Sequence, residues 1–291
     1  MAAVPAQQAG VYHTPSTSRT PAAGVSDMRY YLNEGLEGVE HQQYRNTRSF
    51  TKAIESRAKE FHSGNLDAGQ YLVFASVTKS ELADIDRLCE ARHKGLRSMY
   101  LEGGGALIVK IIPSPVHEMV REGFISALME QTGRMGLRRA LVDMRGTALQ
   151  GIESRKEANS AFKPRLSRPL YTDWPTLVLE CGIPESLKRL RAEARWWLSN
   201  SMGEVKTVLL LSTSKTDRKI HVEQWEVSTV THPLVTRTHQ LDILGAVATG
   251  APLRLEFEKV FLRQPGPDEG DIILTATDLG DLAARVWSAA Q

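Results

Sequence analysis

Short apolar segments recur along the chain and predict β-strands. Residues 106–112 form a β-branched apolar run, and residues 97–101 precede it across a turn that contains Gly103, Gly104 and Gly105. Two such runs flanking a glycine turn predict a β-hairpin. Residues 70–76 predict a strand or a buried helical turn. Further strands are expected at 137–144, 155–159, 176–180, 205–212, 220–227, 253–262 and 272–274.

Apolar residues spaced three and four positions apart predict helices. The pattern is clear in residues 79–94, 116–135, 185–200 and 279–290, and it is weaker in the charged segment 27–62. Ser114 and Asp278 precede two of these helices and are expected to cap them, because a short polar side chain can accept a hydrogen bond from the first helical turn.

The segment 176–212 predicts a strand–helix–strand unit. A right-handed crossover through the helix would make its two strands parallel neighbours in one sheet. The whole pattern therefore predicts an α/β fold in which helices flank a central mixed sheet. Residues 1–26 lack apolar periodicity and are expected to be a disordered tail. Residues 27–95 are expected to form a helical N-terminal region, and residues 96–291 the α/β domain.

Composition adds little about function. The chain has 291 residues, 42% hydrophobic and 24% charged, with a formal net charge of +2. Cys89 and Cys181 are far apart and predict neither a disulfide framework nor a metal site. We find no apolar run of membrane-spanning length and no secretion signal. We therefore expect an intracellular protein, cytoplasmic or nuclear, without a membrane partner.

Candidate chemical groups lie at the ends of the predicted strands and the starts of the predicted helices. Acidic candidates are Glu118, Glu153, Glu157 and Glu180, and basic candidates on one side of the helix 185–200 are Lys188, Arg191 and Arg195. Two carboxylates and a nearby cation could hold a divalent metal and a phosphodiester. Each group also has a structural explanation, such as helix capping by Glu118 or pairing of Glu180 with a helix arginine. On spacing alone the structural explanation is favoured.

The order of several short motifs resembles a known superfamily. These motifs are KEANSAFKP at 156–164, WPTLVLECGIPES at 174–186, RWWL at 195–198, VKTVLLL at 205–211 and IHVEQWE at 220–226. In order and spacing they resemble fungal proteins and bacterial restriction-endonuclease proteins of the PD-(D/E)XK nuclease-like superfamily. The resemblance covers residues 107–225. It implies a restriction-endonuclease-like fold, with a four-stranded mixed sheet flanked by helices.

The resemblance also implies roles for particular residues. Glu180 matches the acidic residue of the catalytic strand, and Glu118 matches a glutamate of the first core helix. Asn159 stands where a metal-binding aspartate is expected, and Glu157 is a substitute for it. Gly182 replaces the usual lysine, so Arg195 of the following helix is the nearest match. The implied cofactor is Mg²⁺, and Lys188 and Arg191 would contact nucleic acid.

Two departures from the family pattern bear on activity. Asn159 offers a neutral oxygen where an anion is wanted, and an arginine at position 195 remains protonated and cannot act as a base. Two hypotheses follow. The chain is either a metal-dependent nuclease with a weakened site or an inactive nuclease fold that binds nucleic acid or a protein partner.

Overall fold

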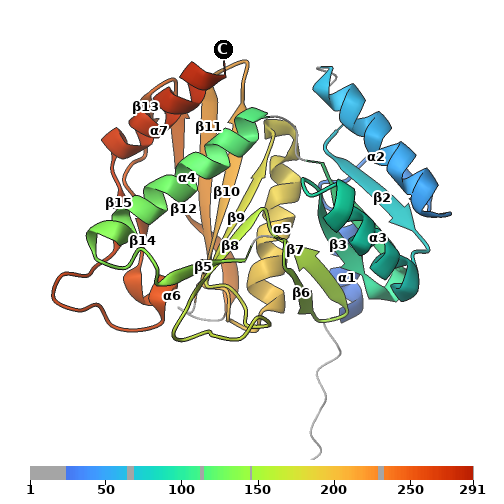
Figure 1. The fold of residues 1–291 in the computed structure, drawn as a ribbon, viewed down its shortest axis with the longest axis horizontal. Coiled ribbons are helices and arrows are strands. Elements are labelled where there is room, and N and C mark those ends of the chain that lie inside the picture. Colours follow the sequence, from blue (N-terminus) through green and yellow to red (C-terminus); the bar gives the residue numbers. More distant parts are fainter. Residues whose placement is uncertain (1–23, 64–68, 112–114, 145, 229–232, 291) are drawn as a thin grey trace, which may run out of the picture.

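The computed structural model describes residues 24–63, 69–111, 115–144, 146–228 and 233–290. The expected tail lies outside these residues up to position 23, as does the expected helix cap Ser114. Helices and sheets alternate in five layers across the molecule (Figure 1). Three apolar clusters fill the spaces between these layers.

A seven-stranded mixed sheet forms one half of the molecule. Its strand order is β13-β12-β11-β10-β9-β8-β5, and only the β9–β10 pair is parallel. The strands are β5 (Leu141–Asp143), β8 (Ser160–Pro164), β9 (Leu177–Gly182), β10 (Thr207–Ser214), β11 (Lys219–Ser228), β12 (Leu234–Leu244) and β13 (Val247–Thr249). The parallel pair confirms the predicted strand–helix–strand unit.

Helices α4 (Pro115–Arg134) and α7 (Ala276–Ala289) cover the outer face of this sheet (Figure 1). Near them lie the short helix α6 (Phe257–Phe261) and the strand pair β14 (Leu253–Leu255) and β15 (Ile272–Leu274). These elements bury apolar side chains such as Phe124, Leu282 and Phe257 against the sheet. Burial of this apolar surface is the main stabilising contribution to the layer.

A six-stranded mixed sheet forms the other half, with strand order β1-β2-β4-β3-β7-β6. Its strands are β1 (His41–Gln43), β2 (Tyr71–Ala75), β3 (Arg97–Leu101), β4 (Ala106–Lys110), β6 (Ala148–Gly151) and β7 (Ser154–Glu157), and the 3-10 turn Glu102–Gly104 completes the predicted β3–β4 hairpin. Helices α2 (Thr47–His62) and α3 (Lys79–Arg92) cover its outer face.

Helix α5 (Leu187–Asn200) lies between the two sheets (Figure 1). Helix α1 (Gly24–Asn33) packs beside it. Because both faces of α5 contact a sheet, its two tryptophans, Trp196 and Trp197, are fully buried. The chain crosses from one sheet to the other between β7 and β8, through Ala158 and Asn159.

Several predicted elements differ from the observed ones. The segment 27–95 contains strands β1 and β2 as well as helices, and β2 pairs with β4 across the expected boundary at residue 95. The expected four-stranded sheet has seven strands. The expected strand 253–262 divides into β14 and α6. Thr275 caps α7, while Asp278 occupies the third helical position, and its carboxylate accepts a hydrogen bond from the backbone N–H of Thr275.

No helix in the described ranges is long and apolar enough to span a bilayer.

Candidate functional site

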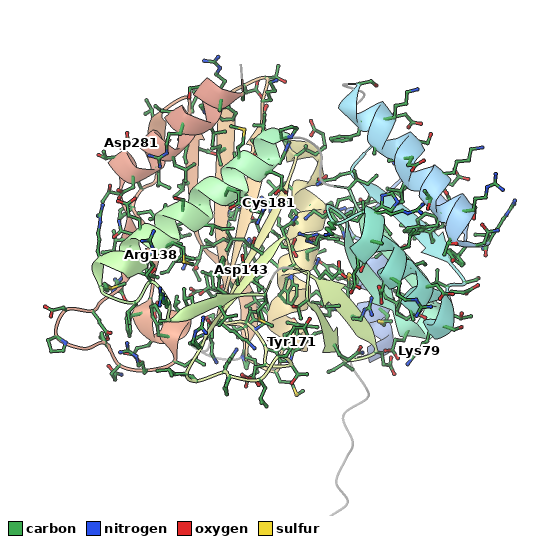
Figure 2. The ribbon with its side chains drawn as sticks, in the orientation of Figure 1. Lys79, Arg138, Asp143, Tyr171, Cys181 and Asp281 are labelled. Carbon is green, nitrogen blue, oxygen red and sulfur yellow. The ribbon has the colours of Figure 1, made fainter. Side chains whose placement is uncertain are left out.

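Glu180 lies near the end of β9 and is completely buried. Side chains alternate across a strand, so Glu180 shares the face of Val178, which packs in the apolar cluster around α5. Its carboxylate accepts hydrogen bonds from Trp197 Nε1 at 2.8 Å and Lys110 Nζ at 3.2 Å, and it pairs with Lys156 Nζ at 3.0 Å. Cys181, labelled in Figure 2, marks its place in the molecule.

A second buried carboxylate, Glu193 of α5, shares the two lysines with Glu180. Its Oε2 lies 3.2 Å from Lys110 Nζ and 3.3 Å from Lys156 Nζ, and Oε1 lies 3.6 Å from Arg189 Nε. Burial alone would raise the pKa of Glu193, but the three cations outweigh burial and hold the pKa well below its usual value. Glu193 is therefore ionised inside the protein.

Asn159 joins this group from the crossover between the sheets. Its Oδ1 accepts hydrogen bonds from Lys110 Nζ at 2.9 Å and from the backbone N–H of Cys181 at 3.1 Å. Together, these residues form what we call the buried lysine–glutamate cluster: Lys110, Lys156, Asn159, Glu180, Arg189 and Glu193. Each member is at most 2% exposed. The cluster links β4, β7, β9 and α5, and so both sheets.

The carboxylates of the cluster have cationic partners without a metal ion, because the three cations Lys110, Lys156 and Arg189 surround the two carboxylates of Glu180 and Glu193. Burial disfavours the Lys110 ammonium, but Glu193, Tyr71 and Glu180 more than compensate and raise the pKa of Lys110. The ammonium nitrogens of Lys110 and Lys156 lie against the oxygens of Glu180 that would have to coordinate a cation. Within the described ranges, no three His, Cys, Asp or Glu side chains are grouped as metal ligands. The residues present do not fit the Mg²⁺ implied by the sequence resemblance.

Glu118 and Glu157 lie elsewhere, on the wall of a groove of about 1010 Å³. The side chain of Glu118, in the first turn of α4, is 40% exposed and pairs with Arg121 Nη2 at 2.6 Å. Glu157 ends β7, and burial raises its pKa despite the nearby Arg97 and Arg155. The groove is lined by Asp86, Cys89, Glu90, His93, Lys94, Gly95, Leu96, Arg97, Pro115, Glu118, Arg121, Gly146, Ala148, Arg155, Glu157 and Tyr171.

The three basic residues predicted on α5 do not reach Glu180. Arg195 is exposed, and its guanidinium lies over the ring of Tyr30 at 5.2 Å from the centroid. It follows Glu193 by two positions, so the helical turn directs it to the opposite side of α5. The sequence resemblance implies that Glu118, Asn159, Glu180 and Arg195 share one cleft. The structure does not bring these four residues together.

Lys188 and Arg191, the predicted nucleic-acid contacts, both have acidic partners. Lys188 pairs with Glu37 and lies 3.7 Å from Glu34. Arg191 donates two hydrogen bonds to Glu223, at 3.1 and 2.6 Å. These contacts reduce the charge that each residue would offer to a phosphate backbone, although Glu223 is also shared with Arg237 at 2.8 Å.

Three residues of the cluster, Lys110, Arg189 and Glu193, are not among those predicted from the sequence. Lys110 ends the apolar run of β4, and Arg189 and Glu193 resemble the usual charged residues of an exposed helix face. The spacing of Glu193 and Trp197, four positions apart on one helix face, was the available signal. Only the packing of α5 between two sheets makes that face buried.

Comparisons with known proteins do not assign the chain to a family. No family model matches it, and no curated protein matches it. Among solved structures, the chain is similar to a protein from Anabaena variabilis, a suggested nuclease of the DUF820 family. The two share 12% identity, with a TM-score of 0.39 over 64% of this chain and 90% of the other. The chemistry of the site therefore rests on the residues of this chain.

Proposed function

We propose that this chain is a non-hydrolytic binding module on a nuclease-like α/β scaffold. The observation that carries the proposal is the state of Glu180, which is 0% exposed and is held by Lys110, Lys156 and Trp197. A metal-dependent nuclease needs carboxylates that are free to hold a metal, and this metal must reach both the attacking water and the phosphate. Here, two lysine ammoniums take the positions around Glu180 that this chemistry requires.

The groove beside Glu118 and Glu157 is the ligand site we propose for this module. Arg155 Nε and His93 Nε2 are buried and have no hydrogen-bond partner within the described ranges. Lys94 is exposed and lies within 4 Å of no described carboxylate. Buried polar groups are usually satisfied, so these groups favour a ligand rich in hydrogen-bond acceptors. The volume of the groove, about 1010 Å³, is similar to that of large small-molecule binding sites in proteins.

A cleavage assay tests the absence of hydrolysis. Plasmid DNA, single-stranded DNA and RNA are incubated with the full chain and Mg²⁺ or Mn²⁺, and the melting temperature is measured with each metal. We expect no cleavage and no metal-dependent rise in melting temperature, because bound metal would stabilise the folded state. Cleavage that is lost in Glu180→Gln and retained in Glu185→Gln, a variant of an exposed glutamate of the same segment, would contradict the proposal.

A binding screen tests the groove separately. Glu157→Gln and Lys94→Ala change the groove without touching the buried lysine–glutamate cluster. A ligand found by thermal-shift screening of acceptor-rich small molecules should bind at least tenfold more weakly to Lys94→Ala. Lys215→Ala, an exposed lysine in the β10–β11 turn, is the matched control. Equal binding by both lysine variants would place the ligand outside the groove.

A further inference from the structure

A protruding loop between β8 and β9 exposes three large apolar side chains. Leu166 is 91% exposed, Leu170 64% and Tyr171 76%. Hydrogen bonds fix the backbone of the loop. Lys163 Nζ donates to the Leu170 carbonyl, and the Asp173 carboxylate accepts from the Leu170 N–H. Its apolar side chains therefore project from an ordered backbone, and water is a poor environment for them.

Three arginines without acidic partners adjoin this loop. Arg138 and Arg139 precede β5, and Arg165 begins the loop; all three are exposed. Arg165 joins the two segments, since its N–H donates to the Ala140 carbonyl at 2.8 Å and its Nε donates to the Arg139 carbonyl at 3.1 Å. No described carboxylate lies within 4 Å of these guanidiniums, whereas the exposed Arg134 and Arg263 have acidic partners.

We name these six residues the basic loop surface: Arg138, Arg139, Arg165, Leu166, Leu170 and Tyr171. Figure 2 labels Arg138 at one end and Tyr171 at the other, with Asp143 of β5 between them. Lys163 and Arg168, in the neighbouring part of the chain, are buried, so the exposed positive charge comes from Arg138, Arg139 and Arg165, against the nearby acidic residues Asp143 and Asp173. The surface thus combines positive charge with protruding apolar groups.

We propose that the basic loop surface docks on a bilayer that contains anionic lipids. A bilayer offers anionic headgroups for the arginines and hydrocarbon for Leu166, Leu170 and the Tyr171 ring. A nucleic acid would satisfy the arginines and leave the leucines in water. A folded protein would need pockets matched to side chains that protrude this far.

This docking mode requires no membrane-spanning segment. The expectation of no membrane partner rested on the lack of such a segment in the sequence, and a loop that lies at the headgroup level is a different case. The proposal goes beyond the proposed binding function. The two sites share Tyr171, which also lines the groove, and the variants that test the docking leave Tyr171 unchanged. It predicts reversible, salt-sensitive attachment, because the charges act within a Debye length of the surface.

Vesicle flotation of the full chain tests the proposal. We expect binding to vesicles of phosphatidylcholine with phosphatidylserine, little binding to phosphatidylcholine alone, and release as salt is raised. Joint substitution Arg138→Glu, Arg139→Glu and Arg165→Glu should weaken partitioning by about 100-fold, since each basic residue contributes on the order of fivefold. The matched control is Arg45→Glu, Arg48→Glu and Lys52→Glu, at the start of α2 on the opposite half of the molecule, with the same change in net charge.

A second variant separates insertion from electrostatics. Leu166→Ser with Leu170→Ser keeps every charge, and we expect it to lower partitioning at least tenfold while circular dichroism stays unchanged. Equal partitioning of the loop and control charge variants would overturn the proposal, as would binding that ignores phosphatidylserine. Preference for a DNA oligonucleotide or polyglutamate over anionic vesicles, lost in the loop charge variant, would also overturn it.

Discussion

Lys156 contacts both buried carboxylates, with Nζ 3.0 Å from Glu180 and 3.3 Å from Glu193. Bringing these charges out of water is costly, and their mutual attraction with the surrounding hydrogen bonds offsets that cost. A buried ion cluster of this kind is a weak source of net stability. Loss of Lys156 would still leave Lys110 and Arg189 for the two carboxylates. It is nevertheless severe, because Glu180 Oε1 would lose the cation that lies 3.0 Å away, and breaking a buried ion pair on one side is costly.

Replacement of Lys156 by methionine should therefore destabilise the fold strongly. We expect the free energy of unfolding to fall by about 3–5 kcal/mol, measured by urea denaturation. The exposed pair of Lys79 and Glu102, 2.8 Å apart, is the control, and Lys79→Met should cost less than about 1 kcal/mol. The double variant Lys156→Met with Glu193→Gln should cost less than the sum of its parts. Similar losses in the two single lysine variants would contradict this account.

His117 should make stability depend on pH. It is buried in the first turn of α4, and burial lowers its pKa to about 4 from the ordinary value of 6.5. The unfolded chain binds a proton that the folded protein excludes, so this contribution is complete above pH 6.5 and is lost as pH falls toward 4. The loss amounts to about 3 kcal/mol. Urea denaturation from pH 7 to pH 4 should show a shallower decline in His117→Phe, and an unchanged slope would disprove the assignment.

Two helical glycines differ in what surrounds them. In α7, a Cβ at Gly280 would lie 2.5 Å from the carbonyl oxygen of Ala246, in the turn between β12 and β13. In α4, a Cβ at Gly133 would meet nothing within 4 Å. Gly280 thus permits the close approach of α7 to the sheet, while Gly133 serves no such contact.

The alanine variants of these glycines should have opposite effects. Gly280→Ala forces α7 away from the β12–β13 turn and should lower the free energy of unfolding by about 1–3 kcal/mol. Gly133→Ala should raise it by up to about 1 kcal/mol, because alanine favours the helix. Urea denaturation of both variants measures the difference. Destabilisation by both substitutions would show that helix propensity and the room for a Cβ atom do not explain the presence of glycine at these two positions.

Elements with a continuous apolar run or a strong helical period could be predicted from the sequence. The β9–α5–β10 unit and the β3–β4 hairpin belong to this group. Strand β12 was missed because its residues are largely polar or exposed, and α6 because five residues show no period. Glu180 could be singled out at the end of its strand. Lys110 and Glu193, which lie in the same cluster, could not be singled out. Lys110 and Glu193 are 83 residues apart in the sequence, and only tertiary packing brings them together.

The whole molecule is held together by strands that pair across distant parts of the chain. β4 lies between β2, from before residue 95, and β3, from after it. Leu107 and Val109 of β4 pack in the cluster that α2 and α3 complete. The expected division of the chain at residue 95 therefore cuts through a sheet and through an apolar core.

A fragment of residues 96–291 should fail to fold as a compact monomer. It would lose the β2–β4 pairing and expose the apolar face that α2 and α3 cover. We expect aggregation on size-exclusion chromatography and a weak near-ultraviolet circular dichroism signal. The full chain should unfold in one transition seen alike by circular dichroism and tryptophan fluorescence. A monomeric fragment with the melting temperature of the full chain would show that residues 96–291 fold as an independent domain.

The position of α5 between the sheets also has a kinetic meaning. The apolar inner face of each sheet stays uncovered until this helix is in place. The six-stranded sheet is also incomplete until β7 and β6 pair beside strands from an earlier part of the chain. Nonlocal pairing of this kind slows folding, because loop-closure entropy is lost before the contacts form. A newly made chain would thus hold an unpaired β3 edge until residues 154–157 arrive, and that interval is when it is most exposed to misassembly.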